Sequence, residues 1–164
     1  MLKVEVNDNY ETPDSAYELL KGVGIIKGNV VYDPFFCAGR AKSKMERILG
    51  CVAINHNEDF WDKKKRPKKY DIIITNPPFS VMKKVIHEII RLGKPYAILM
   101  RATHVESKYF RELMKKEKYS IIWPKSRMKF EVDGKSAGSP PFDSVWVTNM
   151  KSKRHPKALC MEKI

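Results

Sequence analysis

Several features that would place this chain in a specialised class are missing. No stretch approaches the roughly 20 consecutive apolar residues that a membrane-spanning helix needs. The opening residues, MLKVEVNDNY, lack the apolar core of a secretory signal peptide. The three cysteines contain no C-x-x-C pair and the four histidines are scattered, so we expect reduced cysteines and no metal site. An intracellular protein that does not enter membranes is the simplest interpretation.

Acidic residues are also scarce relative to basic ones. The chain has 19 Asp and Glu against 32 Lys and Arg, a formal net charge of +13 in 164 residues. A surplus of this size favours a polyanionic partner, most often nucleic acid. The alternative is a basic protein without such a partner.

Neither internal repeats nor linkers interrupt the sequence, so we expect one domain over residues 1–164. Short apolar runs predict strands, and amphipathic segments predict helices that end at glycines. The expected strands are 29–35, 51–55, 70–75, 96–100, 120–123 and 144–148, and the expected helices are 12–21, 38–50, 81–92 and 107–116. This alternation predicts an α/β fold with a mostly parallel sheet between helices.

Two turns follow predicted strands at the edge where such sheets bind ligands. One is DPFFCAG, residues 33–39, and the other is NPPF, residues 76–79. The Asn76 side-chain oxygen and the Pro77 carbonyl are candidate acceptors for the two N–H protons of an adenine amine, which would free its lone pair. Pro77 and Pro78 stiffen the turn, and Phe79 offers a ring on which an extruded base can stack. The alternative is a strand ended by a Pro-Pro turn, with Phe79 packed in the core.

These segments resemble, in order, the motifs of S-adenosylmethionine-dependent amino-methyltransferases that act on adenine N6. TNPPF is similar to their Asn/Asp-Pro-Pro-Phe/Tyr motif, and DPFFCAG to their Asp-Pro-Phe-x-Gly-x-Gly loop. YETPDSAYELL, NEDFWD and PKSRMKF…SPPFDSVWV resemble further segments, the last of them the closing hairpin of small phage and large-virus adenine methyltransferases. The resemblance covers roughly residues 10–150 and implies a Rossmann-like class I methyltransferase fold.

The resemblance also implies which residues bind S-adenosylmethionine. Asp33 would hold the amino group of its methionine part, where the alternative role is that of a turn-forming Asp. Segment 1–28 would close over that part. Asp59 and Phe60 would bind its adenine, unless they form a plain surface loop. The other implied contacts are Tyr10, Thr12, Pro13, Phe35, Phe36, Ala38 and Gly39, of which Thr12-Pro13 is also a plain helix start and Phe35 a plausible core residue.

Three departures from the family pattern weaken the expected cofactor site. Cys37 replaces the first glycine of the loop. Asn55 stands near the position of the usual ribose-binding acid, with Glu58 as a nearby substitute. Only about fifteen residues separate Asn55 from Tyr70, which is tight for a helical crossover. We therefore expect one edge of the sheet to be truncated.

Basic residues occur in three segments. DKKKRPKKYD, residues 62–71, should lie at the amino edge of the sheet as a solvated loop, with phosphate contact or nuclear import as alternatives. The predicted closing hairpin carries Lys125, Arg127, Lys129 and Lys135, candidates for phosphate contacts, and Phe142, which would wedge near the base or pack in the core. Residues 151–164 form an expected basic tail.

The sequence thus predicts an S-adenosylmethionine-dependent adenine-N6 methyltransferase without a metal. DNA is favoured over RNA because of the resemblance to viral enzymes, which also leaves a nuclear or host-cytoplasmic location open. The chain has no room for a separate target-recognition domain, so loops, a homodimer mate or another partner would supply specificity. An RNA adenine methyltransferase, or an inactive member that only binds nucleic acid or a partner, are the alternatives.

Overall fold

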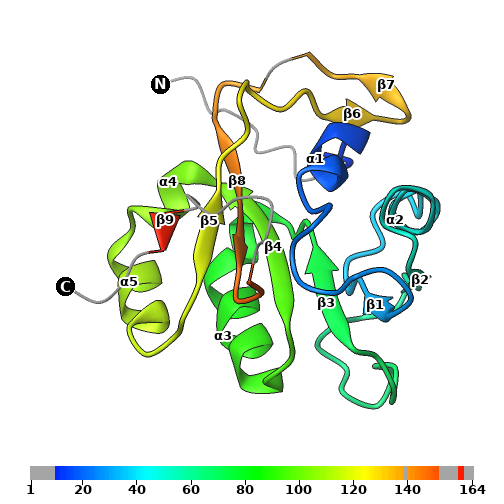
Figure 1. Ribbon diagram of the computed structural model, residues 1–164, viewed down its shortest axis with the longest axis horizontal. Helices are drawn as coiled ribbons and strands as arrows, with labels where there is room; N and C mark the ends of the chain where they lie inside the picture. The colour runs from blue at the N-terminus through cyan, green and yellow to red at the C-terminus, as the bar shows by residue number, and fades with distance from the viewer. Residues whose placement is uncertain (1–9, 139, 152–158, 161–164) are drawn as a thin grey trace.

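A twisted sheet with helices on both faces organises the protein (Figure 1), and the computed structural model describes residues 10–138, 140–151 and 159–160. The seven-stranded sheet has the order β2-β1-β3-β4-β8-β5-β9. Its strands are β1 Val30–Tyr32, β2 Val52–Ile54, β3 Ile72–Thr75, β4 Tyr96–Arg101, β5 Ser120–Ile122, β8 Ser144–Thr148 and β9 Leu159–Cys160. A separate hairpin pairs β6 Glu131–Val132 with β7 Lys135–Ser136.

The strands β2, β1, β3 and β4 run parallel, and β8 is antiparallel to both of its neighbours. Every residue of β3 and β8 is buried, as expected for central strands covered on both faces. The predicted α/β fold with a mostly parallel sheet is confirmed.

The helices divide between the two faces of the sheet. They are α1 Asp14–Glu18, α2 Ala41–Leu49, α3 Met82–Leu92, α4 Ala102–Val105 and α5 Lys108–Met114, with a 3₁₀ turn η1 at Phe79–Val81. Side chains of α1 and α2 share one core cluster with Trp146, whereas α3 and α5 share the other with Val145 and Val147. Gly50 and Gly93 end α2 and α3 in the left-handed conformation, as their positions predicted.

Some predicted boundaries were wrong. The first strand ends at Tyr32 instead of residue 35, because Asp33 turns its side chain back to the backbone amide of Phe35. The predicted helix over 12–21 is the short α1, and α4 was not predicted. The expected tail, residues 151–164, lies outside the described residues except for Lys151 and β9.

The edge of the sheet at β2 is truncated, as the spacing predicted. No helix or strand occurs between residues 55 and 71, all of which are described, and β2 is the last strand on this side in the described ranges. The segment is fixed by Arg66, which donates to the carbonyl of Phe60 at 2.7 Å and pairs with Glu88 on α3 at 2.5 Å. Because Arg91 also donates to Glu88, the pKa of that carboxyl falls to about 2.

Within the described ranges, every helix is too short or too polar to cross a lipid bilayer.

Candidate active site

The two loops singled out by the sequence meet at the carboxyl ends of β1 and β3. These strands are paired in parallel, so the residues that follow them emerge side by side. The Thr75 hydroxyl donates to Oδ1 of Asp33 at 2.7 Å and joins the two loops directly. The predicted proximity of DPFFCAG and NPPF is therefore confirmed.

Asp33 has an unusual electrostatic environment. Its side chain is 3% exposed, and its Oδ1 accepts hydrogen bonds from Thr75 and from the Phe35 amide. No cation in the described part of the chain forms an ion pair with it. Burial raises the pKa of Asp33 to about 7, although both hydrogen bonds oppose the rise. A buried carboxyl without a cation is suited to bind the amino group of a ligand.

Two adjoining cavities lie over these loops. A small one of about 20 Å³ contains Asp33 in its wall, together with Thr12 and Lys44. A larger one of about 310 Å³ is lined by Glu58, Asp59, Phe60, Trp61 and Pro78. Tyr10, Phe35, Phe36, Cys37 and Asn76 line both, so the two cavities form one elongated site.

The segment before α1 closes one side of this site. Its Glu11 exchanges backbone hydrogen bonds with Glu131 of the hairpin, with N–O distances of 2.8 and 3.3 Å. The Glu11 side chain is ion-paired with Arg40. Lys44 of α2 donates to the Thr12 carbonyl at 3.0 Å and pairs with Glu131 at 2.8 Å. Residues 10–12 are thus tied to both α2 and the hairpin.

The DPFFCAG loop contains two left-handed residues. Gly39 has φ +74°, and a Cβ there would lie 2.6 Å from Cζ of Phe36, so a larger residue would be strained and would displace the Phe36 ring. Cys37 is exposed and has φ +47°, a backbone conformation that is unfavourable for residues other than glycine. The departure from the family pattern at Cys37 therefore leaves the backbone turn in place but under strain.

Replacing Cys37 by glycine should relieve that strain. We expect Cys37→Gly to raise the free energy of unfolding by about 0.5–1 kcal/mol, because the left-handed penalty exceeds the added chain entropy of glycine. Urea unfolding followed by circular dichroism measures the change. As a matched control, Cys51→Gly removes a buried thiol and should destabilise the protein. A lower stability of Cys37→Gly would contradict the argument.

Asn55 and Glu58, the predicted ribose contacts, lie in different environments. Asn55 is 4% exposed, and its amide donates to the carbonyls of Asp33 and Phe35 at 3.2 and 3.3 Å. Asn55 therefore supports the backbone of the DPFFCAG loop, and it lines neither cavity. Glu58 is exposed in the wall of the larger cavity and pairs with Lys65 at 3.3 Å.

The aromatic pair Phe60-Trp61 lies beside the larger cavity. Phe60 is 2% exposed, with the Arg66 guanidinium 4.5 Å from its ring centroid and Phe35 5.4 Å away. Trp61 is 42% exposed and lines the same cavity. Sequence reasoning missed Trp61, although its position directly after Phe60 was a usable signal. Asp59 is also exposed there, and its carboxylate accepts from the Trp61 amide at 2.9 Å.

The NPPF turn presents Asn76 in a defined orientation. The Asn76 amide nitrogen donates to the Tyr10 carbonyl at 3.1 Å, which only an NH₂ group can do, so Oδ1 is the acceptor end of the side chain. The Pro78 carbonyl accepts from the Val81 amide at 3.2 Å and is committed to the 3₁₀ turn. Pro77, whose side chain is buried, therefore carries the better candidate for a second acceptor.

Phe79 is covered in this structure. Its ring is 7% exposed, with the Arg101 guanidinium 4.6 Å from its centroid and Phe142 edge-on at 5.4 Å. Phe142 is half-buried and also lies 6.0 Å from Tyr10. A base can stack on Phe79 only after one of these covering groups moves.

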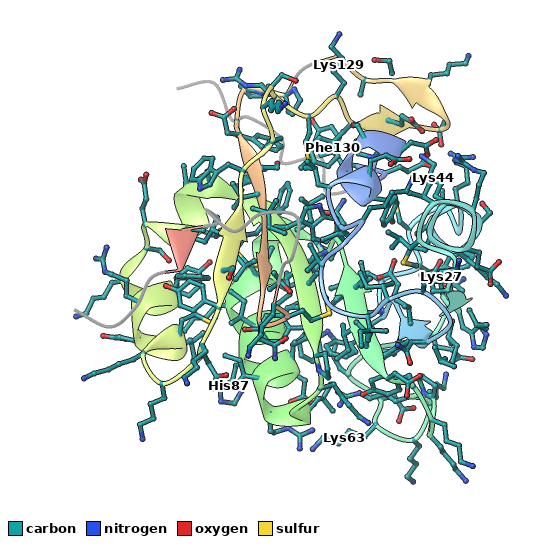
Figure 2. The ribbon with its side chains drawn as sticks, in the orientation of Figure 1. Lys27, Lys44, Lys63, His87, Lys129 and Phe130 are labelled. Carbon is teal, nitrogen blue, oxygen red and sulfur yellow. The ribbon has the colours of Figure 1, made fainter. Side chains whose placement is uncertain are left out.

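The basic residues of the 124–130 segment follow a period of two. Met128 and Phe130 are buried, whereas Lys125, Arg127 and Lys129 are exposed. Figure 2 shows Lys129 projecting from the end of the molecule that carries the hairpin, and Lys63 at the opposite end. Arg127 pairs with Asp143 at 3.0 Å, which lowers its availability for phosphate. Lys135 is exposed on β7.

No three Asp, Glu, His or Cys side chains of the described residues converge as metal ligands would.

Comparison with known proteins agrees with these features. The model of a family described as "Adenine-specific methyltransferase EcoRI" matches residues 37–139, a range that contains Trp61 and the NPPF turn. No curated protein sequence matches the chain.

Solved methyltransferases share the fold. A dimethyladenosine transferase from Plasmodium falciparum superposes with TM-score 0.54 and 12% identity, covering 88% of this chain and 63% of that one. The 23S rRNA methyltransferase ErmE gives 0.51 and 8%, covering 88% and 70%. A precorrin-6y C5,15-methyltransferase from Geobacter metallireducens GS-15 gives 0.50 and 8%, covering 87% and 95%. The chain spans less than two thirds of the Plasmodium protein.

Proposed function

The chain belongs to the EcoRI family of adenine-specific methyltransferases, and we propose that it transfers a methyl group from S-adenosylmethionine to the N6 amine of adenine in DNA. One observation carries the proposal. The Tyr10 carbonyl holds the Asn76 amide so that its oxygen is the acceptor end. The same small cavity is lined by Asp33, a buried carboxyl with no cation partner among the described residues. This pairing provides one group for the amine of the base and one for the amino group of the cofactor.

The residues of the elongated site fit the cofactor. Asp33 would pair with the amino group of its methionine part, and the small cavity by Thr12 and Lys44 adjoins that carboxyl. The larger cavity of about 310 Å³ would take the adenosine, with Glu58 placed for the ribose hydroxyls. Phe36, Ala38 and Gly39 would let the backbone of the loop approach it. When bound, the cofactor supplies an electrophilic methyl group on sulfur.

The chain's own residues would prepare the amine. The Asn76 oxygen and the Pro77 carbonyl would accept its two N–H protons and draw the nitrogen toward tetrahedral geometry. The two prolines fix the carbonyl direction, so little reorganisation accompanies the reaction. Phe79 would stack on the extruded base once its cover has moved, a contact worth about 1–3 kcal/mol. No metal takes part in this scheme.

Trp61, rather than the buried Phe60, should stack on the cofactor adenine. We expect Trp61→Ala to weaken S-adenosylmethionine binding about 5- to 15-fold, corresponding to the loss of about 1–1.5 kcal/mol of stacking. The measurement is calorimetric titration of the cofactor into the wild type and the variant.

Trp123 gives a matched control for that substitution. It is 53% exposed and directly follows β5, which lies two strands beyond β4 in the sheet, away from β1 and β3. Trp123→Ala should bind the cofactor as the wild type does. Equal affinity in all three proteins would remove Trp61 from the site.

The net charge of +13 supports a nucleic-acid substrate but does not separate DNA from RNA. DNA is proposed because the closing-hairpin segment resembles that of small phage and large-virus adenine methyltransferases. We further propose that the exposed Lys125 and Lys129 contact phosphates, and that loops or a partner, including a second copy of the chain, supply sequence specificity.

A direct assay tests the activity. Purified protein is incubated with S-adenosylmethionine and unmethylated DNA, or with RNA transcribed without modification, and the nucleosides are separated by mass spectrometry. We expect N6-methyladenine in DNA. Product in RNA alone would reassign the substrate, and cofactor binding without product in either would reduce the protein to a binding module.

A further inference from the structure

Arg101 lies beside the NPPF turn, with its guanidinium over Phe79, and has no role in the scheme above. It is the last residue of β4, the strand next to β3, whose end carries Asn76. On its other side it is paired in register with Ser144 of β8. Its side chain therefore emerges between the NPPF turn and the segment that carries Phe142.

The guanidinium of Arg101 is held by two aromatic rings. Its Cζ lies 4.6 Å from the ring centroid of Phe79 and 4.3 Å from that of Phe142. These are cation–π distances, and the guanidinium is one of the groups that cover Phe79. An arginine stays ionised at any pH at which the protein folds, so a full positive charge sits over the proposed base-stacking ring.

This charge is not neutralised by a carboxylate. Among the described residues none forms an ion pair with Arg101, and its Nε is buried without a hydrogen-bond partner. The nearby Asp143 is engaged by Arg127 at 3.0 Å. Leaving a buried charged donor unsatisfied costs more than an ordinary hydrogen bond is worth, so the arrangement favours an anionic ligand.

Two further polar atoms close to Arg101 also lack partners. They are Nε2 of His104, whose ring lies 6.2 Å from Phe79, and Oγ of Ser144. Burial and the charge of Arg101 lower the pKa of His104, so this histidine is neutral near pH 7 and Arg101 supplies the positive charge. Arg101 and His104 both lie against Phe79, and Ser144 is the strand partner of Arg101. Unsatisfied polar atoms on all three residues indicate a subsite that a polar ligand completes.

We propose that Arg101 binds a phosphate of the nucleic-acid strand that carries the target base. In the free protein its guanidinium packs on Phe79 and Phe142 instead. The proposal rests on the proposed function and adds a residue that sequence reasoning did not select. The planar guanidinium matches a phosphodiester with two parallel hydrogen bonds. The same movement of Arg101 toward the phosphate would uncover Phe79 for the base, coupling strand binding to site opening.

Arg101 is a better phosphate anchor than Arg127, which the sequence had favoured. Arg127 is exposed and already paired with Asp143, so binding phosphate there must first break an ion pair. No carboxylate in the described ranges pairs with Arg101, and its guanidinium contacts the proposed stacking ring.

The salt dependence of binding tests this role. Fluorescence anisotropy is measured with labelled single-stranded DNA, duplex DNA and RNA of one sequence over a range of KCl concentrations. The slope of log K against log salt is negative, and a lost phosphate contact decreases its magnitude by about 0.7–0.9. We expect this decrease for Arg101→Met, which keeps the aliphatic packing on both rings, and no decrease for Arg101→Lys, which keeps the charge.

Arg111 on α5 provides the matched control. It is an exposed arginine that donates to the Glu106 carbonyl at 2.8 Å, and α5 lies far from the β6–β7 hairpin (Figure 1). Arg111→Met removes the same charge and should leave the slope unchanged. Thermal melts of all variants show that they are folded. A slope in Arg101→Met equal to that of the wild type, or an equal decrease in Arg111→Met, would overturn the proposal.

The assay needs neither cofactor nor methyl transfer. Failure of the proposed function would appear as absent N6-methyladenine with the slope difference intact. Failure of the Arg101 role would appear as an unchanged slope in a protein that still methylates.

Discussion

Replacing Asn76 by alanine should lower the rate of methyl transfer by about 10²- to 10³-fold, the range found when one oriented hydrogen-bonding group is removed from a reaction centre. The Asn76 oxygen is the group proposed to accept a proton from the amine, and alanine offers nothing in its place. Single-turnover incubation followed by nucleoside mass spectrometry measures the rate. Calorimetry should show that S-adenosylmethionine still binds, because Asp33 is untouched.

Asn76→Asp distinguishes the role of the acceptor oxygen from that of the hydrogen bond to Tyr10. The aspartate keeps an acceptor oxygen but cannot donate to the Tyr10 carbonyl, a bond of 3.1 Å in the wild type. It should retain more activity than Asn76→Ala while losing part of the orientation. If alanine and wild type transferred methyl groups at similar rates, Asn76 would have no part in the chemistry.

Asp33→Asn should raise the stability of the folded protein and weaken cofactor binding at the same time. The carboxyl is 3% exposed and burial raises its pKa to about 7, so its ionised form is disfavoured in the free protein. Asparagine keeps an acceptor for Thr75 without a charge. We expect S-adenosylmethionine to bind about 10- to 150-fold more weakly, the range for loss of one charged hydrogen-bond partner.

The stability effect has a defined dependence on pH. Because the pKa of Asp33 rises from 3.8 to about 7 on folding, the folded protein holds a proton that the unfolded chain has lost between these values. Wild-type stability therefore decreases as the pH rises from 4 to 7, by at most about 4 kcal/mol from this group. Asp33→Asn lacks this contribution, so its advantage in melting temperature should be large at pH 8 and small at pH 4.

Calorimetric scans of both proteins at pH 4, 6 and 8 measure the difference. Asp71→Asn is a matched control, because Asp71 is exposed and accepts from the Val30 amide at 2.8 Å. It should leave cofactor affinity unchanged. An Asp33→Asn protein that is less stable than wild type at pH 8 would show that the buried carboxyl is satisfied by other means.

The layered fold was predictable because its signals are local. Ile72–Thr75 is uniformly β-branched, and Gly50 and Gly93 stand where helices must stop. The truncated edge followed from the short spacing between Asn55 and Tyr70. Pairing between strands that are far apart in the sequence was harder to predict. The sequence SVWVT predicts a strand, but it does not indicate that Ser144–Thr148 inserts between β4 and β5.

Site residues that directly follow strands could be predicted from the sequence. Those whose role depends on contacts between distant side chains were missed. Asp33 and Asn76 each come directly after a buried run, which fixes them at one edge of the sheet. The choice between Phe60 and Trp61 depends on which ring Arg66 covers, a contact that sequence does not contain. The contact of Arg101 with Phe79 and Phe142 likewise depends on rings brought together only by folding.

The backbone pairing between Glu11 and Glu131 has a consequence for synthesis of the chain. These residues are neighbours in space but are separated by most of the polypeptide, and β8 enters the middle of the sheet later still. A chain growing on the ribosome will have exposed Asp33 and Asn76 long before the pieces that enclose them exist. We therefore expect the ability to capture ligand to arise abruptly, once residues 131–148 have emerged and paired, so that shorter nascent chains carry the binding residues without the binding.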